Sequence, residues 1–179
     1  MVFWASLILL NLFQGATGEE GGWRGFALPR LRAIHGPVKA SLILGLAWNF
    51  WHLPLWFLSG FSGLDLMLYV LAFSVTIISL IFLLTWLSVK TPNSLVPIVI
   101  AHFSFNASLN ITDARGLGLV PTLPLFTTMA GVYLVSTILV WSVSGWSTQN
   151  TQSHRIYHEA FRDYKAGSTG PTYYLYLLE

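Results

Sequence analysis

The sequence predicts an all-α protein, a polytopic transmembrane helical bundle of about five membrane helices. Of its 179 residues, 54% are hydrophobic and only 9% are charged, and the mean hydropathy is +0.63. A soluble domain carries roughly 25% charged residues, so this chain has too little polar surface for a soluble globule. The 8 Trp and 7 Tyr suit the membrane–water interface. Open strands leave backbone groups unpaired in lipid, so the spans should be helices.

Five apolar stretches justify the predicted helix count. A spanning helix needs about 20 residues, and the second, third and fifth stretches reach that length. The first and fourth are shorter and contain polar residues. The predicted spans are residues 2–16, 38–59, 64–88, 94–109 and 119–143. Residues 1–143 are therefore predicted to be the membrane domain, and the polar residues 144–179 a cytoplasmic C-terminal tail.

The first stretch has two further interpretations. Val2–Gly18 could be a signal peptide, with small residues at Ala16-Thr17-Gly18, although no Lys or Arg precedes its apolar run. It could also be the end of a larger transmembrane region whose earlier helices are missing here.

Basic residues predict the orientation, because cytoplasmic loops of membrane proteins are rich in Lys and Arg. With five spans, the connectors after the first and third spans and the C-terminal tail lie on one side. That side carries Arg24, Arg30, Arg32, Lys39, Lys90, Arg155, Arg162 and Lys165, whereas the other carries Arg115. We therefore expect an integral, multi-pass protein with its tail in the cytoplasm.

Composition also limits the chemistry. The chain has no Cys, which excludes disulfides, thiolate metal sites and a Cys nucleophile. Its net charge of +2 includes no basic cluster interleaved with aromatics, so nucleic acid is not an expected partner. Membrane lipid is the expected surrounding.

The first polar motif is Glu19-Glu20-Gly21-Gly22-Trp23-Arg24. On a helix, Glu20 and Arg24 are i,i+4 neighbours and can pair. Glu19 then points about 100° away from Glu20 around the helix axis and is free for another task. The alternative is an ordinary interfacial salt bridge at a helix end.

Two further motifs each place a histidine inside an apolar stretch. An ionisable side chain there is a functional-site hypothesis by default. In Trp48-Asn49-Phe50-Trp51-His52 the indole of Trp48 shares a face with His52 and can orient its imidazole. In His102-Phe103-Ser104-Phe105-Asn106 an imidazole and a carboxamide share a face. Hydrogen bonding between helices is the alternative for both histidines.

These side chains suit amide hydrolysis. A carboxylate can act as general base towards water, imidazoles can hold that water or donate to an oxyanion, and Asn106 can supply another donor. Alternatively, Glu19, His52 and His102 could bind Zn²⁺ or another divalent metal with an open water position. Glu19 lies at the cytoplasmic end of its stretch. It reaches the histidines only if its helix tilts or continues through Gly21-Gly22, or if a cavity opens from the cytoplasm.

The three motifs in this order resemble the CPBP intramembrane protease family, which includes the type II CAAX prenyl endopeptidases and the Abi bacteriocin-immunity proteins. The resemblance implies that Glu19 is the catalytic base, with His52, His102 and Asn106 as further catalytic residues. Glu20, Arg24 and Trp48 would support them. One departure is Trp48, where the family usually has Phe, and another is the small number of helices. The family's cofactor is open, either a metal or none.

We therefore predict an intramembrane endopeptidase, of glutamate type or metal-dependent, acting on a prenylated protein or other hydrophobic peptide. A second hypothesis is a non-catalytic immunity or scaffold protein that binds a bacteriocin or partner peptide. A third is a small transporter or proton relay that uses His52 and His102, although the internal repeat common in such proteins is absent.

Overall fold

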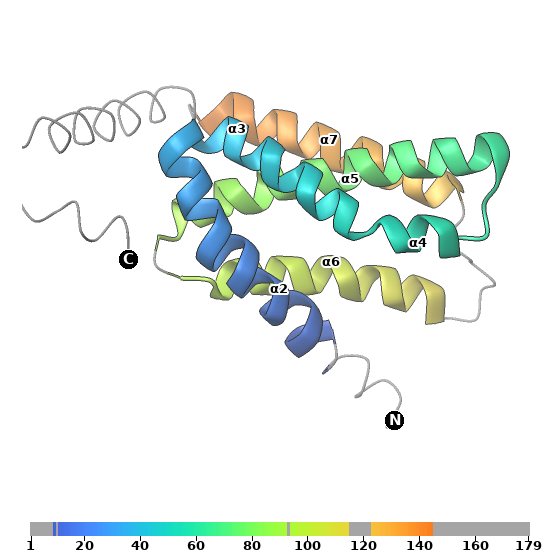
Figure 1. The fold of residues 1–179 in the computed structure, drawn as a ribbon, viewed down its shortest axis with the longest axis horizontal. Helices are drawn as coiled ribbons and strands as arrows, with labels where there is room; N and C mark the ends of the chain where they lie inside the picture. Colours follow the sequence, from blue (N-terminus) through green and yellow to red (C-terminus); the bar gives the residue numbers. More distant parts are fainter. Residues whose placement is uncertain (1–8, 10, 93, 115–122, 145–179) are drawn as a thin grey trace, which may run out of the picture.

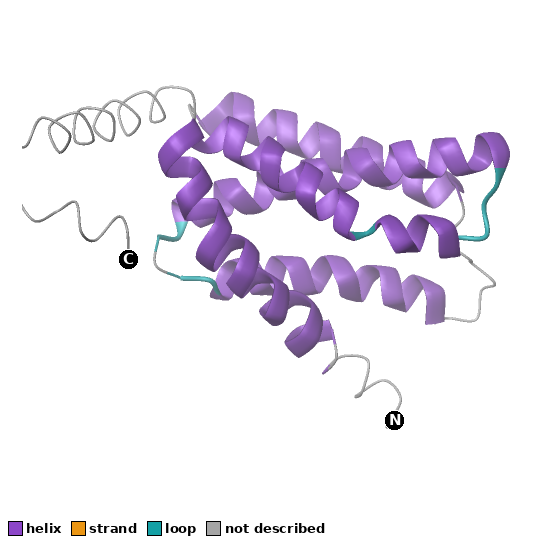
Figure 2. Ribbon diagram, viewed as in Figure 1, coloured by secondary structure: helices purple, strands orange, loops and turns teal. Residues whose placement is uncertain are grey.

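The computed structural model describes residue 9 and residues 11–92, 94–114 and 123–144; for Gln14 and residues 110–114 it describes the backbone alone. Every regular element in these ranges is a helix, as the sequence predicted (Figure 2). The elements in chain order are η1 (Asn11–Thr17), α2 (Gly18–Glu20), η2 (Gly21–Ala27), α3 (Leu28–Trp51), α4 (Leu53–Leu58), α5 (Gly63–Lys90), α6 (Val96–Ala114) and α7 (Leu123–Ser144).

The first three elements and the part of α3 before Gly36 form one continuous helical rod. η1 and η2 are π-helical and flank the single α-helical turn α2, which carries the Glu-Glu pair. π-Helical turns are rare and are often found at functional sites. The rod continues through Gly21 and Gly22 without a break, so one of the routes by which Glu19 could reach the histidines is present.

A sharp bend divides α3 at Gly36. This residue has φ 73° and ψ 166°, a left-handed conformation that glycine adopts readily and other residues do not. Pro37 follows, where its fixed φ suits the first turn of a new helix. In Figure 1 the chain reverses direction within α3, so the segment with the carboxylates and the segment with Trp48 form the two arms of a bent helix.

The second predicted span, 38–59, is not one continuous helix. α3 ends at Trp51, His52 leaves the helical region with ψ 2°, and the short α4 begins at Leu53. Pro54 lies within the first two positions of α4. Proline has no N–H and its ring clashes with the preceding turn, so the helix that contains Trp51 ends before it. The expectation of an unbroken helix was wrong, and the break falls at a candidate site residue.

The helices of the bundle pack mainly around α5. α5 lies against both α3 and α7, and α6 contacts η1 and α5 (Figure 1). The core is formed mainly by side chains of α3 and α5, with contributions from α6 and α7. Its most deeply buried large apolar members are Leu28, Leu44, Trp48, Ile77, Ile81, Leu84 and Ile98.

Two of the described helices, α5 and α7, are long and apolar enough to cross a membrane, and the apolar part of α6, residues 96–109, is shorter. Apolar side chains of α7 such as Ile138 and Val143 are 57% and 86% exposed, which suits a face in contact with lipid. The helical fold is thus confirmed, whereas the number of five spans stays a prediction. Residues 1–8 and the tail from residue 145 lie outside the described residues.

Candidate active site

The carboxylates of Glu19 and Glu20 bind different partners. Glu20 is fully buried, and its Oε1 accepts a hydrogen bond of 2.7 Å from Nη1 of Arg24. Nδ1 of His102 lies 2.7 Å from the same oxygen. The predicted Glu20–Arg24 pair therefore exists. Its side chains have 0% exposure, so it is not an exposed interfacial salt bridge.

Glu19, the predicted catalytic base, contacts α3. Its Oε2 accepts a hydrogen bond of 2.6 Å from Nε1 of Trp48, which lies 29 residues further along the chain. The Glu19 side chain is half-buried and the Trp48 side chain is buried. The bend at Gly36 makes this contact possible, because it folds the two arms of the bent helix onto each other.

Trp48 lies at the centre of the cluster. Its ring is 5.1 Å from the ring of His52 and 5.0 Å from that of His102, both edge-on. The guanidinium of Arg24 lies 5.3 Å from the same indole, within the range of a cation–π contact. The predicted packing of Trp48 on His52 is confirmed. Sequence reasoning missed its contacts with Glu19 and His102, because neither lies at helical spacing from Trp48.

Backbone geometry fixes the orientation of His52. Its Nδ1 lies 2.7 Å from the carbonyl oxygen of Trp48. Because a carbonyl can only accept, Nδ1 carries the proton, and in the neutral imidazole Nε2 is then an acceptor. On the other side, the ring of His52 packs 5.5 Å from that of Phe73.

His102 is oriented by a carboxylate. It is buried, and its Nδ1 donates to Glu20, an arrangement that fixes the ring and leaves Nε2 for water or substrate. Arg24 compensates the charge of Glu20 from the other side, as a buried carboxylate requires. Glu20 and Arg24 thus have a physical role as support for His102.

Asn106 is half-buried on the same face of α6, one turn beyond His102. It lies against η1: a Cβ atom added to Gly15 would stand 3.3 Å from its Nδ2. Gly15 was not among the predicted site residues, because only the packing of two distant helices reveals the close approach. Asn49 was not assigned a role either; it is buried beside Trp48, and its Nδ2 donates to Oγ of Ser74 at 3.0 Å.

The proposed metal ligands do not form a three-ligand group in this structure. Among the described residues, no three His, Asp or Glu side chains are placed to hold a metal ion. Glu19 Oε2 and the Nδ1 atoms of both histidines have protein partners. These contacts leave Nε2 of each histidine as its available ligand atom, and we derive no step of the reaction through a metal.

The described site therefore joins a half-exposed carboxylate, two oriented imidazoles, a buried ion pair and a carboxamide, all carried by helices of a largely apolar bundle. Such groups can supply a general base towards water and hydrogen-bond donors to an oxyanion.

Comparison with known proteins identifies the family. Residues 1–108 match the family model described as type II CAAX prenyl endopeptidase Rce1-like. The match covers more than half of the chain, so the chain belongs to this family, and the resemblance of its three motifs is confirmed. The family is membrane-embedded, which agrees with the apolar helices described above.

One curated relative is the CAAX prenyl protease 2 of Methanococcus maripaludis, 33% identical over 103 residues. The aligned part covers 55% of this chain but only 38% of that relative. The chain thus corresponds to less than half the length of the relative. No solved structure matches the chain.

Proposed function

We propose that this chain is an intramembrane endopeptidase that hydrolyses a peptide bond in a prenylated or otherwise hydrophobic peptide. Family membership supports a protease of the CAAX-processing type. The observation that carries the assignment to residues is that Glu19 and His102, from different helices, both contact Trp48.

In the proposed reaction Glu19 is the general base. Its carboxylate removes a proton from water, and the resulting hydroxide attacks the carbonyl carbon of the scissile bond. Trp48 holds one carboxylate oxygen of Glu19, and Nε2 of His52 is the acceptor that positions the water. The carbonyl π bond breaks as the new C–O bond forms, which gives a tetrahedral oxyanion.

The second half of the reaction involves α6. The carboxamide of Asn106, which lies one turn beyond His102 on α6, donates hydrogen bonds to the oxyanion. The C–N bond then breaks as the carbonyl re-forms, and the proton held by Glu19 passes to the leaving amine. The products are a carboxylic acid and a free amine, and Glu19 returns to its ionised state.

The test uses purified protein with a prenylated reporter peptide, and mass spectrometry locates the cleaved bond. Glu19→Gln keeps the shape of the side chain but removes the base, and we expect cleavage to fall below detection. Asp65→Asn is the matched control, because Asp65 is exposed at the start of α5 and should keep wild-type turnover. Wild-type cleavage by Glu19→Gln would contradict the proposal. Peptide binding without cleavage by the wild-type protein would favour the scaffold hypothesis.

A further inference from the structure

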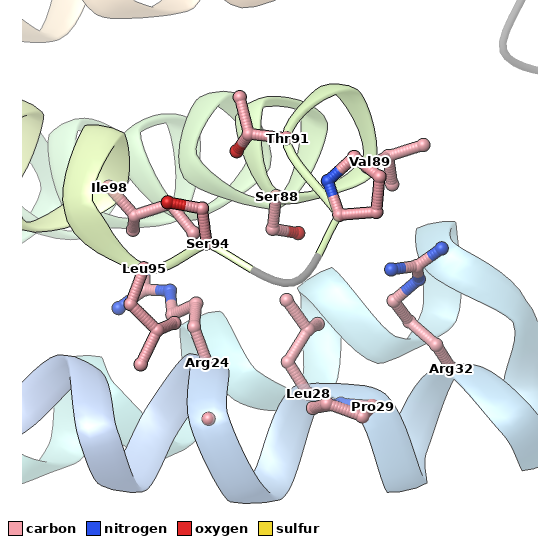
Figure 3. A pocket seen from close by; sticks show the side chains of 12 residues that line it. Arg24, Leu28, Pro29, Arg32, Ser88, Val89, Thr91, Ser94, Leu95 and Ile98 are labelled. Atoms are coloured by element: carbon pink, nitrogen blue, oxygen red, sulfur yellow. The ribbon is translucent and has the colours of Figure 1, made fainter. Parts of the chain in front are cut away.

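A second polar feature lies next to the candidate site. It is a cavity of about 460 Å³ between the η2–α3 arm and the connection from α5 to α6 (Figure 3). Arg24 and Ile98 line it. Arg24 also belongs to the buried ion pair with Glu20, and Ile98 stands one turn of α6 before His102, so the cavity adjoins the contacts that orient His102.

The cavity is cationic. Its lining includes Arg24 and Arg32 but, among the described residues, no Asp or Glu. Figure 3 shows both arginine side chains extending from the η2–α3 arm towards the α5–α6 connection. Nη1 of Arg24 binds Glu20, but Nε and Nη2 of Arg24 are buried without a hydrogen-bond partner among the described residues. Nε of Arg32 is buried in the same way. Buried donors without acceptors cost free energy, so an oxyanion in the cavity would be stabilising.

The other polar groups of the lining do not replace the arginines as donors. The hydroxyls of Ser88 and Thr91 donate to carbonyl oxygens of their own helix, Thr85 O and Leu87 O. Ser94 lies just before α6, whose N-terminus adds positive potential to this side of the cavity. The cavity is therefore suited to an anion, and Arg32, which is only half-buried, is placed to make the direct contact.

We propose that this cavity receives the C-terminal carboxylate of the peptide substrate, with Arg32 as the specificity-determining residue. The inference rests on the proposed function. The position of the cavity supports a peptide as its ligand, because Arg24 is shared between the cavity and the ion pair that orients His102. The size of the cavity does too, because its volume falls within the roughly 300–1,000 Å³ of small-ligand pockets and can hold the end of a peptide chain.

The test compares two prenylated peptides that differ only at the end of the chain, one with a free carboxylate and one with a carboxamide. A charge-assisted contact is worth ~1.5–3 kcal/mol, so we expect the wild-type KM to be at least about tenfold lower for the carboxylate. In Arg32→Gln the KM for the carboxylate peptide should rise to that of the carboxamide, with kcat unchanged. Arg32→Lys, which keeps the charge, should retain part of the discrimination.

The matched control is Arg30→Gln. Arg30 lies on the same helix as Arg32, and its replacement by Gln removes the same charge. Arg30 is exposed, however, and its guanidinium packs 3.8 Å from the ring of Phe26, outside the cavity. It should discriminate between the peptides as the wild type does. Equal cleavage of both peptides by the wild type, or equal loss of discrimination in Arg30→Gln and Arg32→Gln, would overturn the proposal.

A lipid phosphate is the competing occupant. The assay is therefore repeated in vesicles of phosphatidylcholine with and without phosphatidylglycerol. If Arg32→Gln changes the cleavage of both peptides only when phosphatidylglycerol is present, the cavity binds lipid and the proposal is wrong. Failure of the proposed function looks different: Glu19→Gln would then cleave both peptides as well as the wild type, and the carboxylate assignment would fall with it.

Discussion

Trp48 donates a hydrogen bond of 2.6 Å from Nε1 to Oε2 of Glu19 and so joins the two arms of the bent N-terminal helix. A Phe at this position would keep an aromatic ring but has no donor. The indole of Trp48 therefore provides a hydrogen bond to the proposed catalytic base.

Trp48→Phe should keep the packing on both histidines but release the carboxylate of Glu19. A hydrogen bond to a charged group is worth ~1.5–3 kcal/mol, so we expect kcat for the reporter peptide to fall about tenfold or more. Trp86→Phe is the control, because its indole Nε1 is buried without a partner among the described residues. Equal kcat in the two variants would show that the bond to Glu19 does not contribute to turnover.

Glu20→Gln should destabilise the protein as well as inactivate it. The change leaves the buried guanidinium of Arg24 without its counter-charge, which typically costs ~3–5 kcal/mol. Denaturant titration in mixed micelles measures the free energy of unfolding. Asp65→Asn removes an exposed acid at a helix start and should cost less than about 1 kcal/mol. Similar losses in the two variants would contradict the buried ion pair.

Gly15→Ala and Gly22→Ala form a matched pair on the same rod. An added Cβ at Gly15 would stand 3.3 Å from Nδ2 of Asn106, whereas one at Gly22 meets no atom within 4 Å. We expect Gly15→Ala to displace the amide and lower kcat several-fold, while Gly22→Ala keeps wild-type kcat. Alanine favours a helix over glycine by ~1 kcal/mol, so neither variant should unfold. Wild-type turnover by Gly15→Ala would remove Asn106 from the oxyanion site.

Chelation tests the cofactor. No step of the proposed reaction needs a metal, because Glu19 is the base that activates the water, so we expect Glu19-dependent cleavage to continue in EDTA. Elemental analysis of the purified protein should then show no stoichiometric zinc. Loss of activity in EDTA, restored by Zn²⁺, would instead support the metal scheme with these three ligands.

The sequence predicted the local parts of this site well. The spacings that place Glu20 beside Arg24 and Trp48 beside His52 are helical, and both pairs are in contact. Long-range relations were not predictable, because they depend on how the helices bend and cross. The bond between Trp48 and Glu19, the contact of His102 with Glu20 rather than Glu19, and the approach of Gly15 to Asn106 all belong to this class.

The apolar stretch around His52 shows the same limit within a single segment. Its composition predicts one helix, but the break at His52 depends on one residue, Pro54, whose effect on backbone geometry hydropathy does not register. The break also accounts for the orientation of the imidazole, since Nδ1 binds the carbonyl of Trp48 at the end of α3.

Because of the bend at Gly36, the contact between Glu19 and Trp48 depends on the number of residues that separate the carboxylates from the bend. Each helical residue turns the chain by about 100°, so one residue inserted between Glu20 and Gly36 would rotate the carboxylates away from Trp48 while the rest of the bundle stayed in place. The number of residues in each arm is therefore constrained as strictly as the identity of the site residues. A protein designed on this scaffold would have to preserve the length of both arms before any substitution in the site could be interpreted.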